Sequence, residues 1–131
     1  MPALIIGRME VRVAAVRPGT PTMVEAVVAG VRLKAEWVGQ SAQPGKLVDV
    51  ELDIDDVLEW GDTIAIAGSE STLREGPRLR GTVEDHEQQL LTIRIVDGLL
   101  QVELNNGPAD IPPGTAVTAV VEHLKLYPTG I

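Results

Sequence analysis

Apolar and polar side chains alternate along much of the chain, with the two-residue period of half-buried β-strands. The clearest case is the segment 47–55, where apolar residues occupy one face and acids the other. No long segment keeps the 3.6-residue apolar spacing of a helix, so we expect at most one short helix. The alternation, bounded by glycine and proline, predicts strands at 10–16, 23–29, 31–38, 47–55, 62–67, 78–83, 90–96, 99–104 and 116–126.

The glycine and proline positions repeat, which divides the chain into two related halves. Gly30 recurs 68 positions later as Gly98, and Pro44–Gly45 recurs 69 positions later as Pro113–Gly114. Each half is expected to contain a hairpin, and glycine supplies the positive φ that a short hairpin turn requires. These two turns are predicted at Ala29–Gly30 and Asp97–Gly98.

The apolar alternation of the two hairpins does not fit this spacing. Positions 31, 33, 35 and 37 are out of phase with Leu100, Val102 and Leu104 when the halves are aligned 68 residues apart. Either a β-bulge or a one-residue slip in register would restore the match.

Each half has about the size and strand number of an OB barrel, which is five-stranded and partly open. The sequence therefore predicts an all-β protein: two small OB-like Greek-key barrels in tandem, packed together, with little helix. The polar segment 68–77 begins with glycine and ends with proline, as a linker would. The predicted domains are a first half at 1–67, a linker at 68–77 and a second half at 78–131.

The second half contains a Gly-x-Val strand at Gly81–Val83, a central hairpin, and a Pro-Gly-x-x-Val turn at Pro113–Val117 before a last strand. In these features it resembles the TOBE domains. Those domains are OB-type barrels at the C-terminus of some transporter ATPases and, as tandem pairs, in small molybdate-binding proteins. The resemblance implies an OB-type barrel and a small oxyanion as ligand.

The composition narrows the classes of partner. The net charge is −8, with 11 basic and 19 acidic residues, and there are only two tryptophans and one tyrosine. Binding of nucleic acid depends on positive charge and stacking aromatics, so we expect none. Absence of cysteine fits a reducing compartment, and no apolar run approaches the roughly 20 residues of a membrane helix. We expect a cytoplasmic protein without membrane contact.

Acids line the outer face of the strand predicted at 47–55, namely Asp49, Glu51, Asp53 and Asp55. Acids two positions apart on a straight strand lie about 7 Å from each other, so we expect no metal ion there. Two interpretations stay open: a solvated face that discourages pairing at a sheet edge, and a docking surface for a basic partner.

The two tryptophans receive different predictions. Trp37 continues an apolar face and is predicted to be core. Trp60 lies in a turn beside Gly61, and two interpretations stay open for it: a side chain that covers the end of the barrel, and an exposed contact anchor that makes it the better interface candidate. The predicted interaction surface is therefore the acidic strand face together with Trp60.

Basic residues gather at the start of the second half. Arg78 and Arg80 share one face of a predicted strand, and Arg94 lies beside them if the next strand pairs with it. This cluster would suit a small anion. It would equally suit pairing with nearby acids such as Glu84, and both interpretations stay open.

Catalytic signatures are absent from the sequence: there is no nucleophile elbow, dinucleotide-binding loop or phosphate-binding loop. His86 is expected in an exposed turn and His123 within the last strand, far apart in sequence. We expect no enzyme activity, no cofactor and no metal. The sequence favours a non-catalytic module whose partner is another protein, and the alternative is a small-ligand or oxyanion-binding protein. A homodimer stays open.

Overall fold

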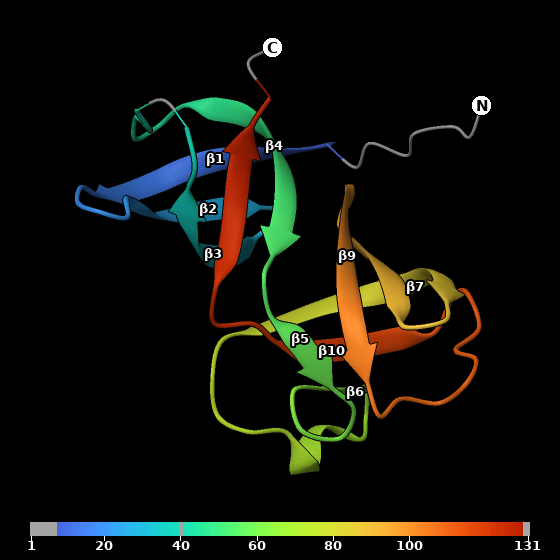
Figure 1. The fold of residues 1–131 in the computed structure, drawn as a ribbon. Helices are drawn as coiled ribbons and strands as arrows, with labels where there is room; N and C mark the ends of the chain where they lie inside the picture. Colours follow the sequence, from blue (N-terminus) through green and yellow to red (C-terminus); the bar gives the residue numbers. More distant parts are fainter. Residues whose placement is uncertain (1–7, 40, 130–131) are drawn as a thin grey trace. The chain divides into compact units, whose positions relative to one another are not determined.

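The computed structural model describes residues 8–39 and 41–129, and this part of the chain is nearly all β (Figure 1). The predicted fold class, two barrel-like sheets with little helix, is confirmed. The elements in chain order are β1 (Arg8–Arg17), β2 (Met23–Val28), β3 (Val31–Trp37), β4 (Leu47–Ile54), β5 (Val57–Glu59), β6 (Ile64–Ile66), the 3₁₀ turn η1 (Glu70–Thr72), β7 (Arg78–Glu87), β8 (Leu90–Ile95), β9 (Gly98–Asn105), β10 (Ala116–Val120) and β11 (Leu124–Pro128).

The first sheet is a closed barrel with the strand order β1-β2-β3-β11-β4. Figure 1 shows β11, in red, between β3 and β4. β11 runs parallel to β3, with Leu126 opposite Trp37, and the Val38 N–H donates to the Leu126 carbonyl at 3.0 Å. Trp37 is buried, as predicted. The alternating inward side chains that fill this barrel include Met9, Val11, Val13, Val24, Ala26, Leu33, Ala35, Val50, Leu52 and Leu126.

The second sheet has the strand order β5-β9-β8-β7-β10-β6, which leaves β5 and β6 as its edges. β5 runs parallel to β9, with Leu58 opposite Leu104, and β6 runs antiparallel to β10. Its core is again aliphatic and includes Leu58, Ile64, Leu79, Val83, Leu91, Ile93, Leu100, Val102, Leu104 and Val117.

Strands β5 and β11, each of which follows the fourth strand of its half, belong to the sheet of the other half. β5 follows β4 in the chain but pairs with β9, and β11 follows β10 but pairs with β3. The compact units accordingly comprise residues 8–53, 96–99 and 124–129 in the first and 54–95 and 100–123 in the second. Sequence halves and compact units therefore have different bounds. The chain ends of the predicted halves, 1–7 and 130–131, lie outside the described residues.

The two halves share bulges and turns residue by residue. β1 has a bulge after Val13 and β7 has one after Val83. The Gly45 N–H donates to the Val13 carbonyl at 2.7 Å, and the Gly114 N–H donates to the Val83 carbonyl at 2.8 Å. Equivalent residues are 70 apart between β1 and β7, 67 apart between β2 and β8, and 69 apart between β4 and β10. The duplication seen in the sequence is thus present in the backbone.

The 67-residue spacing explains the mismatch in the hairpins. Leu33 and Leu100 become equivalent, and both are buried. The one-residue slip is therefore confirmed. The turn of the second hairpin is formed by residues 96 and 97, so the predicted turn Asp97–Gly98 is wrong by one residue, and Gly98 begins β9. The apolar alternation is compatible with a turn at either position. The predicted turn was placed one residue too late because it was assigned to the glycine.

Two strands differ from the sequence prediction. The single last strand predicted at 116–126 is two strands, β10 and β11, which belong to different sheets. The short strand β5 was not predicted, because three residues are too few to show an alternation. Both differences arise where the chain passes from one sheet to the other.

The segment predicted as a linker, 68–77, packs against the second sheet. It contains η1, and Leu73 is buried in a cluster with Ala65 and Val120. The Arg74 N–H also donates to the Asp62 carbonyl at 3.0 Å. The segment thus covers the outer side of β10 at Val120.

Candidate functional site

The acidic face of β4 lies on a strand that has neighbours on both sides, β1 and β11. Its acids therefore do not protect an exposed sheet edge. Glu51 is exposed, whereas Asp49 and Asp53 are half-buried. Across the ladder to β1, Arg8 is opposite Glu51 and Glu10 is opposite Asp49. The face is acidic, and the neighbouring strand β1 contributes the basic residues Arg8 and Arg12 to it.

Comparison with β10 explains why this face is charged. At the 69-residue spacing, Asp49 corresponds to Thr118 and Glu51 to Val120, and both are buried. Leu73 covers the second-half face, so its outward positions must be uncharged or apolar. The β4 acids occupy the equivalent positions in the first half, and there the side chains reach solvent.

The other two predicted interaction residues lie in the second unit. Asp55 is exposed just after β4, and Trp60 is half-buried at the start of the turn 60–63 between β5 and β6. The Trp60 N–H donates to the Asn105 carbonyl at 3.0 Å, and the Asn105 amide donates to the Glu59 carboxylate at 2.8 Å. The predicted surface is thus divided: Asp49, Glu51 and Asp53 belong to the first unit, Asp55 and Trp60 to the second.

A cavity of about 280 Å³ lies in the second unit beside β5. Val57, Leu58 and Val120 supply its apolar lining, and Val57 is 50% exposed. The charged side chains of the cavity are Asp56, Arg74, Glu122 and His123, and Thr63 completes its lining.

The charges around this cavity are partly paired. His123 Nδ1 lies 3.4 Å from an Asp56 carboxylate oxygen. The Arg74 guanidinium donates two hydrogen bonds to the Asp62 carboxylate, and the one from Nε is 3.1 Å long. This contact lowers the pKa of Asp62 and raises that of Arg74, first through the hydrogen bonds between the two side chains and then through the attraction of their charges. Glu122 forms no ion pair with another described residue.

The arginine cluster is largely tied to acids. Arg80 lies 3.4 Å from Glu70, and Arg94 pairs with Glu84. The pKa of Glu70 is lowered, first by the Gly68 N–H that donates to its carboxylate at 2.7 Å and then by the charge of Arg80. Arg78 is exposed on β7. The structure therefore shows the acid-paired arrangement for Arg80 and Arg94.

Neither histidine lies where the sequence indicated. His86 is a half-buried residue of β7 rather than part of an exposed turn, and its Nδ1 accepts the Ile111 N–H at 2.9 Å. β7 is simply longer than its apolar alternation shows. His123 is exposed in the break between β10 and β11, not within a strand. Among the described residues, no group of three or more His, Asp or Glu is arranged to hold a metal ion.

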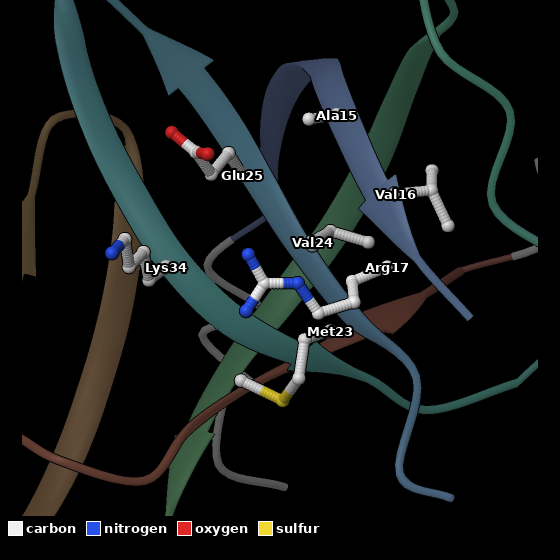
Figure 2. Close-up of a pocket in the computed structure, with 7 residues that line it drawn as sticks. All are labelled: Ala15, Val16, Arg17, Met23, Val24, Glu25 and Lys34. Atoms are coloured by element: carbon white, nitrogen blue, oxygen red, sulfur yellow. The ribbon is translucent and has the colours of Figure 1, made fainter. Parts of the chain in front are cut away.

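A second cavity, of about 180 Å³, lies in the first unit and was missed from the sequence (Figure 2). It is lined by residues of β1, β2 and β3, with Arg17, Glu25 and Lys34 as its charged members. The sequence shows these residues only as polar positions of alternating strands. The bulge that brings them together has no local sequence signal.

A scan against protein-family models, a search of curated proteins and a search of solved structures found no match. Within residues 8–39 and 41–129, no helix is long and apolar enough to span a membrane. Function must therefore be argued from the two cavities and the charged faces themselves.

Proposed function

We propose that this protein is a non-catalytic interaction module that binds another protein along the β5 edge of its second sheet. The observation that carries the proposal is the cavity beside β5. There the exposed apolar side chain of Val57 adjoins Leu58 and Val120, and Asp56 and Glu122 add carboxylates. A mixed pocket that exposes Val57 and holds Glu122, which forms no ion pair with another described residue, suits a partner segment that presents an apolar side chain next to a lysine or arginine.

The neighbouring turn supports this proposal. Trp60 begins the turn 60–63, which also supplies Thr63 to the cavity. Thr63 is held by the backbone of Glu59, whose N–H donates to the Thr63 hydroxyl at 2.7 Å. Half-buried tryptophans on a fixed backbone are frequent energetic anchors of protein interfaces. Trp60 is therefore the aromatic contact that the proposal requires.

The acidic face of β4 has a secondary part in the proposal. Charges at exposed positions change the rate of encounter and its salt dependence more than they change affinity. Asp49, Glu51 and Asp53 would thus attract a basic partner without forming the anchored contact. We take the frame that carries both surfaces to be of the OB type, which the five-stranded closed barrel supports.

The test is quantitative affinity capture from an extract of the cells that make the protein. The edge variant combines Val57→Ala and Trp60→Ala, and the face variant replaces Asp49, Glu51 and Asp53 by lysine. Leu47→Ala, which changes another exposed apolar residue, serves as the control. We expect the edge variant to lose at least about nine-tenths of the partner, because anchor residues cost 2 kcal/mol or more on truncation.

The face variant should lose partner mainly when the salt concentration is low, and Leu47→Ala should behave as wild type. Urea unfolding of each variant shows that its fold is intact. If folded edge and face variants both recover every partner in wild-type amount, the proposed function is wrong.

A further inference from the structure

The cavity of the first unit exists because β1 is bulged. The register of β1 against β2 shifts between Val13 and Ala15, and an extra residue of this kind separates and redirects side chains. The side chains around the resulting hollow come from three strands. They are Ala15, Val16 and Arg17 from β1, Met23, Val24 and Glu25 from β2, and Lys34 from β3.

Two cations in this cavity have no acidic partner. Within the described part of the chain, neither Arg17 nor Lys34 forms an ion pair. Figure 2 shows the Arg17 guanidinium extending from β1 over β2, toward the side on which Lys34 stands. An unpaired guanidinium offers a fork of N–H donors that matches a carboxylate, and the ammonium adds a second charge.

Glu25, the acid of the cavity, is engaged elsewhere. Its carboxylate lies 3.6 Å from Arg32, which does not line the cavity. Glu25 also lies opposite Lys34 in the ladder of β2 and β3, so the cavity lining holds two cations and one acid. The charge left for a ligand in the cavity is positive, although the whole chain carries a net charge of −8.

The rest of the lining is apolar and limits the size of the ligand. The Met23 thioether lies on the same face of the strands as the cations, whereas Val16 and the buried Val24 are paired on the opposite face. The cavity of about 180 Å³ is smaller than the roughly 300 Å³ at which pockets for drug-sized ligands begin. A short aliphatic chain that ends in a carboxylate matches both the charge and the apolar wall.

The second half shows that the frame does not require these cations. Its β7 has the same bulge, and the 70- and 67-residue spacings identify the counterparts of the cavity residues. Ala15 corresponds to Asp85, Arg17 to Glu87 and Lys34 to Gln101. The same backbone position is acidic in one half and basic in the other, so the two cations belong to this site and not to the fold.

We propose that the cavity formed by Arg17, Lys34 and Met23 binds a small aliphatic carboxylate. The Arg17 fork and the Lys34 ammonium hold the carboxylate oxygens, and the chain lies against Met23. The site is in the first unit and shares no residue with the proposed protein-binding edge, so either can fail without the other.

The test is a titration of the ¹⁵N-labelled protein with butyrate, followed through backbone amide resonances. Saturable shifts in the millimolar range are expected at Val16, Glu25 and Lys34, and none at their counterparts His86, Thr92 and Gln101. Arg17→Gln should weaken binding by about tenfold, because it removes a charge-assisted pair of hydrogen bonds. Ala15→Asp, which adds the acid found in the second half, should abolish binding.

Two controls separate the site from general attraction to positive charge. Arg78→Gln removes the same charge from an exposed position of β7 and should leave butyrate affinity unchanged. Formate, which has the carboxylate without the chain, should bind more weakly than butyrate because it leaves the apolar wall in water. Saturation at the counterpart amides as well, or equal affinity in wild type, Arg17→Gln and Ala15→Asp, would overturn the proposal.

Discussion

The first sheet is closed and the second is open, although the two halves of the chain share their bulges, hairpins and turn hydrogen bonds. In the closed barrel the exchanged strand β11 has β3 and β4 as neighbours. In the second sheet the exchanged strand β5 has β9 on one side and forms an edge on the other. The same frame therefore leaves edge strands, β5 and β6, in the second sheet only.

The outward faces of the equivalent strands β10 and β4 also differ. The segment 68–77 covers β10, whose outward residues Thr118 and Val120 are buried, whereas the equivalent β4 residues are acids. At the bulges the signs are reversed, with Arg17 in the first half and Glu87 in the second. Duplication preserved the backbone, and function is to be sought where the side chains differ.

The largest expected effect concerns the two exchanged strands. Leu126→Ala and Leu58→Ala each remove a fully buried side chain, and each should cost about 2–5 kcal/mol of unfolding free energy. Leu126→Ala should cost more, because β11 has two neighbouring strands and β5 has one. Urea midpoints of the two variants measure the difference. A larger loss for Leu58→Ala would show that closure of the first barrel does not strengthen its exchanged strand.

A smaller effect is expected at one pair of equivalent core positions. Val11 in β1 corresponds to Gly81 in β7. Val11 is opposite Val48 in the ladder to β4, and Gly81 is opposite Val117 in the ladder to β10. A Cβ atom on Gly81 would lie 2.6 Å from the Arg94 carbonyl oxygen and 2.4 Å from Ile93 Cγ2. Gly81→Ala should therefore cost about 1–3 kcal/mol by overpacking.

The control for this prediction is Thr82→Ala at the next, exposed position of β7, which should change stability by less than about 0.5 kcal/mol. Thermal unfolding of both variants is the measurement. Equal melting temperatures for Gly81→Ala and Thr82→Ala would mean that the second sheet has room for a side chain where the first has Val11.

The smallest effect concerns the segment that covers β10. The pKa of Glu70 is lowered by the Gly68 N–H and by Arg80, so the charged form is favoured in the folded state. This contribution to stability is fully present above pH 4.5, the ordinary pKa of the side chain, and is lost as the pH falls through the lower folded value. Glu70→Gln should lose less stability than wild type between pH 6 and pH 3. The free energy of unfolding of the two proteins is measured with urea at each pH. If it changes equally with pH in both, Glu70 does not contribute this pH dependence.

Much of the fold follows from the sequence, because alternating apolar residues and glycine turns act locally. Leu47–Ile54 and its inward residues were predicted within one position. The exchange of β5 and β11 could not be predicted, since a pairing such as Leu126 with Trp37 joins residues distant in sequence. Folding of the segment 68–77 onto β10 was missed because Leu73 is its one apolar residue in the buried cluster with Ala65 and Val120, too few to show a pattern, and its polar contacts, such as that of Arg74 with Asp62, are not visible in the sequence.

The candidate sites were less predictable than the fold. The acids of β4 were found because they alternate with apolar residues on one strand. Arg17 and Lys34 lie on different strands and meet only through the bulge after Val13. Pairing of the arginine cluster with Glu84 was one of the two interpretations left open, and Arg94 does pair with Glu84, whereas Glu70 as the partner of Arg80 became visible only when the chain was folded.

The central claim is that the exchanged strands make the two halves a single folding unit with two different surfaces. The natural probes are Trp37, buried in the first barrel, and Trp60, in the second unit. In each of the variants Trp60→Phe and Trp37→Phe, urea unfolding is followed by the fluorescence of the remaining tryptophan and by circular dichroism of the whole chain. If the two halves unfold together, the two signals have one coincident midpoint in both variants. A fluorescence transition that covers only one of two separate steps in circular dichroism would contradict the central claim.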